Sequence, residues 1–76
     1  MLSYIYRLYR AFELEMGYPP NVLLINHTHL MRLASELGEE QDLAVIRQRL
    51  GLEIIGRRDL PHPLVNWHPS AARKAG

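Results

Sequence analysis

The fold predicted for this sequence is organised around the stretch Asn21-Val22-Leu23-Leu24-Ile25-Asn26. Its four consecutive apolar residues lie between Pro19-Pro20 and the polar segment His27-Thr28-His29. A short apolar run without alternation, bounded by residues that break regular structure, is typical of a strand covered on both faces. We therefore predict that residues 22–25 form the central strand of a sheet.

The residues before this strand carry the pattern of an amphipathic helix over 3–16. Its apolar positions recur at helical spacing, which places them on one side: Ile5, Leu8, Tyr9, Phe12 and Met16. Ser3 is expected to cap the start of the helix. Gly17, followed by Pro19-Pro20, predicts its end.

Two further helices are predicted between the central strand and Gly51. Asn26 is expected to cap the first, whose apolar face is Leu30, Leu33, Ala34 and Leu37 and which ends at Gly38. The second has acidic residues near its start (Glu39, Glu40, Asp42) and basic residues near its end (Arg47, Arg49). That distribution complements the helix dipole.

The predicted elements follow the order helix, strand, helix, helix, strand, strand (α-β-α-α-β-β), with the last two strands at 52–56 and 64–67. The long helical connection over 26–51 is typical of a crossover between parallel strands, and the short loop 57–63 favours an antiparallel final strand. We predict a small mixed α/β (α+β) domain over 1–68, with a three-stranded mixed sheet and helices packed on at least one face. Residues 69–76 are expected to form a flexible C-terminal tail.

Size and composition limit the possible functions. The chain has 76 residues, no cysteine and a formal charge of +1. One domain of this length has a marginal core, and such domains often associate. The sequence contains no apolar run long enough to span a bilayer and no signal-peptide pattern. We expect a cytoplasmic protein with no membrane partner.

The surplus of apolar residues on so short a chain predicts a homodimer. Some of these residues fall outside the expected core-facing stripe of the first helix, and others lie on the last strand. The candidate interface residues are Tyr4, Tyr6, Leu14, Val65 and Trp67.

A second hypothesis places an anion site where the two parallel strands end. Open α/β sheets bind ligands at the carboxyl edge of their strands, and polar residues follow both strands there. The candidates are Asn26, His27, His29, Arg57 and Arg58. Free amides at a helix start, beside guanidinium groups, suit a phosphate or a carboxylate. The alternative is that Asn26 only caps a helix and the arginines only solvate a loop.

Metal binding, catalysis and cofactors are not predicted. The four histidines supply at most one pair of ligands by spacing, whereas a catalytic zinc needs about three. Asp59 and His62 are the only acid and base expected near each other at that edge, and no Gly-rich phosphate loop is present.

Nucleic-acid binding is a weaker alternative. Arg47, Arg49, Arg57 and Arg58 are close in sequence, but the net charge near zero lacks the broad positive footprint of such proteins.

The segment Pro20–Asn26, a helix containing Leu30 and Leu33, and then Leu50–Ile55 with Asp59-Leu60-Pro61 resemble the strand, helix and strand rhythm in one subdomain of tailed-phage capsid proteins. The resemblance covers about half of the chain. It implies a shared α/β packing pattern and no function.

From the sequence we therefore expect a small soluble interaction or accessory module that is homodimeric and has no catalytic activity of its own. The alternatives are a small-anion binding protein or enzyme at the sheet edge, and a weak nucleic-acid binder.

Overall fold

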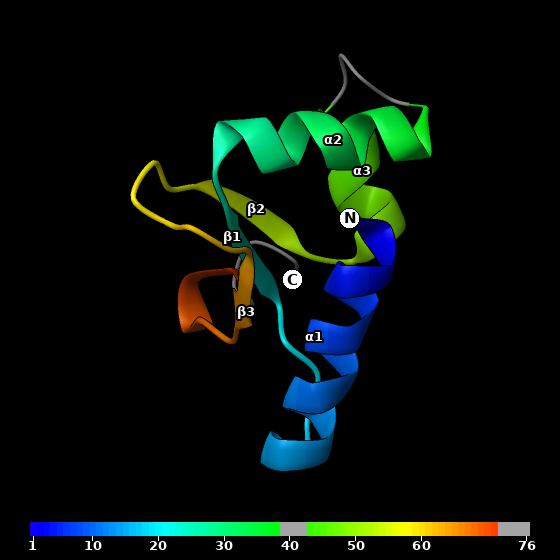
Figure 1. The fold of residues 1–76 in the computed structure, drawn as a ribbon. Coiled ribbons are helices and arrows are strands. Elements are labelled where there is room, and N and C mark those ends of the chain that lie inside the picture. The colour runs from blue at the N-terminus through cyan, green and yellow to red at the C-terminus, as the bar shows by residue number, and fades with distance from the viewer. Residues whose placement is uncertain (39–42, 72–76) are drawn as a thin grey trace.

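The computed structural model describes residues 1–38 and 43–71. In chain order the elements are α1 (Leu2–Met16), β1 (Val22–Ile25), α2 (His27–Leu37), α3 (Leu43–Leu50), β2 (Glu53–Gly56) and β3 (Leu64–Asn66). This is the predicted order, and the mixed α/β class with helices packed on a three-stranded sheet is confirmed (Figure 1). The acidic residues predicted at the start of the second inner helix, Glu39, Glu40 and Asp42, lie outside the described residues.

The sheet has the strand order β2-β1-β3, so β1 is central as predicted. It pairs in parallel with β2, in the register Leu23 to Ile54, and antiparallel with β3, in the register Leu23 to Val65. The last two strands thus run in opposite directions, but they do not form a hairpin because β1 lies between them.

The core lies on the face of the sheet that the helices cover. Leu23 and Ile25 of β1 pack there against Ile5 of α1, Leu33 of α2 and Ile46 of α3, and all these side chains are almost completely buried. Burying one such side chain stabilises a fold by roughly 1.5–3 kcal/mol. Each of these three helices therefore contributes a side chain that shields β1 from solvent.

The two ends of α1 are stabilised differently. Gly17 has a φ of 82°, a left-handed conformation that glycine adopts without strain, and its amide donates to the Glu13 carbonyl at 2.9 Å. The predicted Ser3 cap is wrong, because α1 already begins at Leu2 and Ser3 lies inside its first turn. A carboxylate from α2 acts instead: Glu36 Oε1 accepts from the N-terminal ammonium at 2.9 Å and Oε2 from the Leu2 amide at 2.8 Å.

The chain after β3 is tied back to the start of β1. Asn21 Oδ1 accepts from the His68 amide at 2.7 Å, and Asn21 Nδ2 donates to the His68 carbonyl at 2.8 Å. Residues 69–71, which the sequence placed in the flexible tail, are helical, and the Ala71 side chain is buried. The remaining tail residues, 72–76, lie outside the described part of the chain.

The Glu36 cap makes the stability of α1 depend on pH. The hydrogen bond from the N-terminal ammonium, and then that from the Leu2 amide, hold the pKa of Glu36 below its usual 4.5. A carboxyl group whose pKa is lower in the folded chain stabilises it above the unfolded pKa, and this contribution is lost as the pH falls through the folded pKa. We expect Glu36→Gln to lower the thermal midpoint at pH 7, and the difference from the parent chain to shrink once the pH falls below 4.5.

Thermal unfolding followed by circular dichroism across this pH range measures the effect. The matched control is Glu15→Gln on α1, whose carboxylate makes no hydrogen bond within 1–38 and 43–71. Equal midpoints for Glu36→Gln and Glu15→Gln at pH 7 would contradict the cap.

Candidate functional site

The carboxyl ends of β1 and β2 meet at one edge of the sheet because these strands are parallel. The ladder continues one residue beyond β2, where the Arg57 amide donates to the Ile25 carbonyl at 2.9 Å. Asn26 and the start of α2 follow Ile25 directly. The structure thus places two of the predicted anion-site residues, Asn26 and Arg57, next to each other.

Both polar atoms of the Asn26 side chain make hydrogen bonds at this edge. Its Oδ1 accepts from the His29 amide at 2.8 Å, which is the predicted helix cap. Its Nδ2 donates to the Leu60 carbonyl at 2.9 Å, which ties the loop after β2 to the start of α2. Asn26 is therefore a structural residue, with both polar atoms of its side chain in hydrogen bonds to the main chain.

Arg57 already has a carboxylate partner. Its Nε and Nη2 donate to Asp59 Oδ1 and Oδ2 at 3.1 and 2.9 Å, in a bidentate pair between two exposed side chains. The pair raises the pKa of the Arg57 guanidinium and lowers the pKa of the Asp59 carboxyl. Asp59 thus neutralises one of the two arginines assigned to the anion, and it pairs with Arg57 instead of the His62 considered from sequence.

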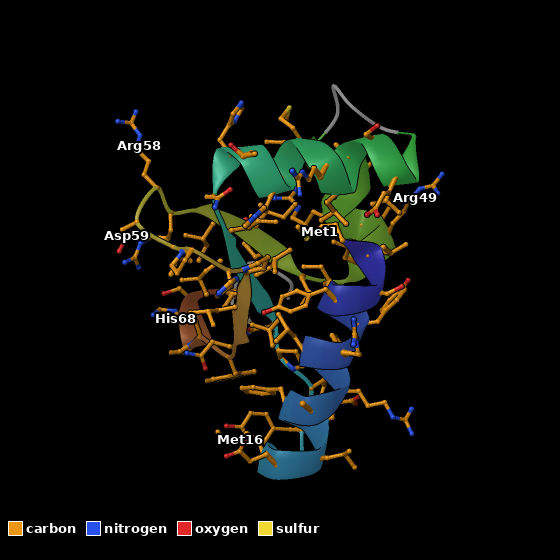
Figure 2. All side chains as sticks on the ribbon, viewed as in Figure 1. Met1, Met16, Arg49, Arg58, Asp59 and His68 are labelled. Atoms are coloured by element: carbon orange, nitrogen blue, oxygen red, sulfur yellow. The ribbon has the colours of Figure 1, made fainter. Side chains whose placement is uncertain are left out.

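The other three candidates do not converge with Arg57. Arg58 extends from the loop into solvent (Figure 2) and forms no ion pair with a described residue. His27 is exposed, whereas His29 is half-buried. Residues i and i+2 of a helix are about 200° apart around its axis, so the imidazoles of His27 and His29 point in different directions. The Nδ1 of His29 is buried and has no hydrogen-bond partner.

No group of three or more metal-ligating side chains occurs among residues 1–38 and 43–71. His62 lies in the loop after β2, whereas His68 is held beside Asn21, at the opposite end of β1. His68 Nδ1 accepts from the Ser70 amide at 3.1 Å, so one of its nitrogens caps the helical turn after β3.

The arginines considered for nucleic acid are also engaged in part. Arg47 Nη1 lies 3.2 Å from Glu53 Oε1, and Arg57 is held by Asp59. These two ion pairs reduce the charge that those arginines present to a phosphate backbone.

The five residues predicted as a dimer interface do not lie on one surface. Val65 is partly buried and packs against the core. On α1, Tyr4 and Tyr6 are about 200° apart around the axis, and Leu14, 79% exposed, is on the solvent side.

Trp67 belongs to an aromatic cluster that sequence reasoning missed. Its ring meets Tyr18 edge-to-face with the centroids 6.3 Å apart, and Tyr18 meets Phe12 in the same way at 5.7 Å. The Trp67 ring therefore contributes to the packing between the end of α1 and the end of β3.

The structure also shows two grooves beside β2 that sequence reasoning missed, one on each face of the sheet. One groove of about 340 Å³ has an apolar part formed by Val22, Ile55 and Ala71. The other, of about 230 Å³, lies between β2 and α3 and is lined by Leu43, Ala44 and Arg47. Glu53 and Ile54 line both grooves. The available signal was the strand itself, Glu53-Ile54-Ile55-Gly56, which carries no proline and no lysine.

Comparison with protein-family models, curated proteins and solved structures finds no match for this chain, and so gives no support to the resemblance with tailed-phage capsid proteins. Within the described residues, no helix has the length and apolar character needed to cross a membrane.

We expect Asn26→Ala to destabilise the fold by about 1–2 kcal/mol, because it removes both the cap of α2 and the tether to Leu60. Urea unfolding at pH 7 measures this change. Thr28→Ala, an exposed position in the first turn of the same helix, is the matched control and should change stability by less than about 0.5 kcal/mol. Equal losses for the two variants would show that the cap contributes nothing.

Proposed function

We propose that this chain is a small protein-interaction module that works as a homodimer and has no catalytic activity of its own. One observation carries the proposal: the sheet ends at β2, whose outer side is flanked by exposed apolar side chains. Leu43 of α3 lines the groove on one face and is 51% exposed, whereas Ile55 lines the groove on the other and is 39% exposed. An unpaired strand edge with apolar flanks favours association with another chain.

The size of the chain supports the same proposal. Among the described residues, the large side chains that are fully buried are few: Ile5, Leu23, Ile25, Leu33, Ile46 and Leu52. A domain of this length buries only about 60% of its unfolded surface, so association adds a useful amount of burial. The five residues predicted from the sequence are not carried into the proposed interface, because the structure does not place them on one surface.

Sedimentation equilibrium of the 76-residue chain tests the proposal. We expect a reversible monomer–dimer equilibrium over roughly 1–100 µM, because a small interface gives an association free energy of about −6 to −8 kcal/mol. The apparent mass should rise from that of one chain toward that of two. A mass that stays at 8.8 kDa across the whole range would refute the homodimer.

Anion binding is a second candidate, favoured by the contact between the start of α2 and the loop after β2. The first amides of α2 point out of the helix end, and Arg58 is the arginine of this loop that has no ion pair with a described residue. With Asp59 holding Arg57, the affinity for a single phosphate should be weak.

A titration of the ¹⁵N-labelled chain with inorganic phosphate tests this second candidate. We expect the His27 and Thr28 amide signals to shift at about 10 mM phosphate, and Arg58→Ala to weaken the response about threefold, as for an exposed ion pair. Arg32→Ala, at an exposed arginine further along α2, is the matched control. Absence of any shift at these amides in the parent chain would exclude the site.

A further inference from the structure

The hydrogen-bond pattern of β2 identifies the main-chain groups that are free. The Glu53 amide donates to the Asn21 carbonyl, and the Arg57 amide to the Ile25 carbonyl, each at 2.9 Å. Alternate residues of a strand direct their polar groups to the same side. Glu53, Ile55 and Arg57 therefore face β1, whereas the amides and carbonyls of Ile54 and Gly56 face the outer edge. No described strand pairs with that edge.

Natural edge strands are usually protected by a proline, a lysine or a bulge. β2 has none of these, and a side chain added at Gly56 would meet no atom within 4 Å. The charges lie at its two ends, with Glu53 at the start and Arg57 immediately after Gly56. The edge is therefore open to a second strand whose charges are arranged in the opposite order.

We propose that β2 pairs antiparallel with β2 of a second copy of this chain, in the register that sets Ile55 opposite Ile55 of the copy. This inference rests on the homodimer proposed above and identifies its interface. The two sheets then join into one continuous sheet with the strand order β3-β1-β2-β2-β1-β3. A two-fold axis perpendicular to the sheet passes between the two Ile55 residues, as in an isologous interface.

The register follows from the main-chain groups. With Ile55 on the axis, Ile54 lies opposite Gly56 of the second copy, so each outward amide meets an outward carbonyl. The Ile54 side chain also covers the open space beside that glycine. The Ile55 side chains meet as a close, non-hydrogen-bonded pair, the arrangement in which cross-strand apolar contacts are strongest.

Charge complementarity selects a second copy as the occupant. In this register Glu53 lies opposite Arg57 of the second copy, and Arg57 lies opposite Glu53. Arg47 and Asp59 already flank these residues within one chain, so each end of the paired strands carries a row of alternating charges, Arg47, Glu53, Arg57, Asp59. A register centred on Ile54 would instead set Glu53 opposite Ile55 and bury a carboxylate against an apolar side chain.

The experiment combines charge reversal with a main-chain variant, and sedimentation equilibrium measures the dissociation constant. Glu53→Arg and Arg57→Glu each set like charges opposite each other at two symmetric positions, and should each raise the constant about tenfold. The double variant restores opposite charges and should return within about threefold of the parent. Arg58→Glu makes the same charge change as Arg57→Glu, but at a side chain that extends into solvent (Figure 2). It should have little effect on the dissociation constant.

Gly56→Pro removes an amide that faces away from β1, so the chain should still fold while the dissociation constant rises at least about tenfold. Gly56→Ala keeps that amide and is its matched control. Circular dichroism verifies that each variant is folded, and hydrogen exchange gives an independent readout. The Ile54 and Gly56 amides of the parent chain should gain protection as its concentration rises.

The outcomes separate this inference from the proposed function. A parent chain that stays monomeric refutes both. A dimer that tolerates Glu53→Arg and Gly56→Pro, or whose Ile54 and Gly56 amides stay unprotected, retains the homodimer and overturns the β2 interface. A dimer weakened by Gly56→Pro but not rescued by the double charge reversal overturns the register.

Discussion

The fold depends on the hydrogen-bond requirement of one buried strand. β1 is almost entirely apolar and has neighbours on both sides, so its amides and carbonyls have no access to water and must all be paired. Its partners are β2 and β3, both of which come much later in the chain. α2 and α3 form the connection that brings β2 alongside β1 in parallel, and they also cover the sheet. α2 and α3 thus set the topology and, together with α1, supply the helical side of the core.

Single polar side chains link segments that are distant in sequence. Asn21 holds the His68 main chain at one end of β1, and Asn26 holds the Leu60 carbonyl at the other. Glu36 of α2 accepts from the N-terminal ammonium of Met1 and from the Leu2 amide at the start of α1. In each case the side chain satisfies main-chain groups that secondary structure leaves unpaired.

Contacts within the chain also weaken the case for an anion site at the carboxyl edge of the sheet. Asn26 and Arg57 are adjacent there, as parallel pairing requires, but each is already occupied by a residue of this chain, Leu60 or Asp59. Among the described residues, further groups without a partner lie along the outer edge of β2, where main-chain amides and carbonyls stand between exposed apolar side chains. Main-chain groups at an open edge favour recognition of another strand, whereas an anion site requires cations that remain free.

The sequence by itself determined the elements, because the physics of each is local. The apolar run 22–25, the stripe that begins at Ile5, and the cap formed by Asn26 depend on residues within a few positions of each other. The α1 start could not be predicted from Ser3, because its capping carboxylate comes from Glu36 on another helix. Likewise, only the tertiary structure decided that Asp59 pairs with Arg57, that Trp67 packs on Tyr18, and that β2 forms one of the two edges of the sheet. These contacts depend on which distant segments meet, and in a sheet this is decided by strand order, which local patterns do not encode.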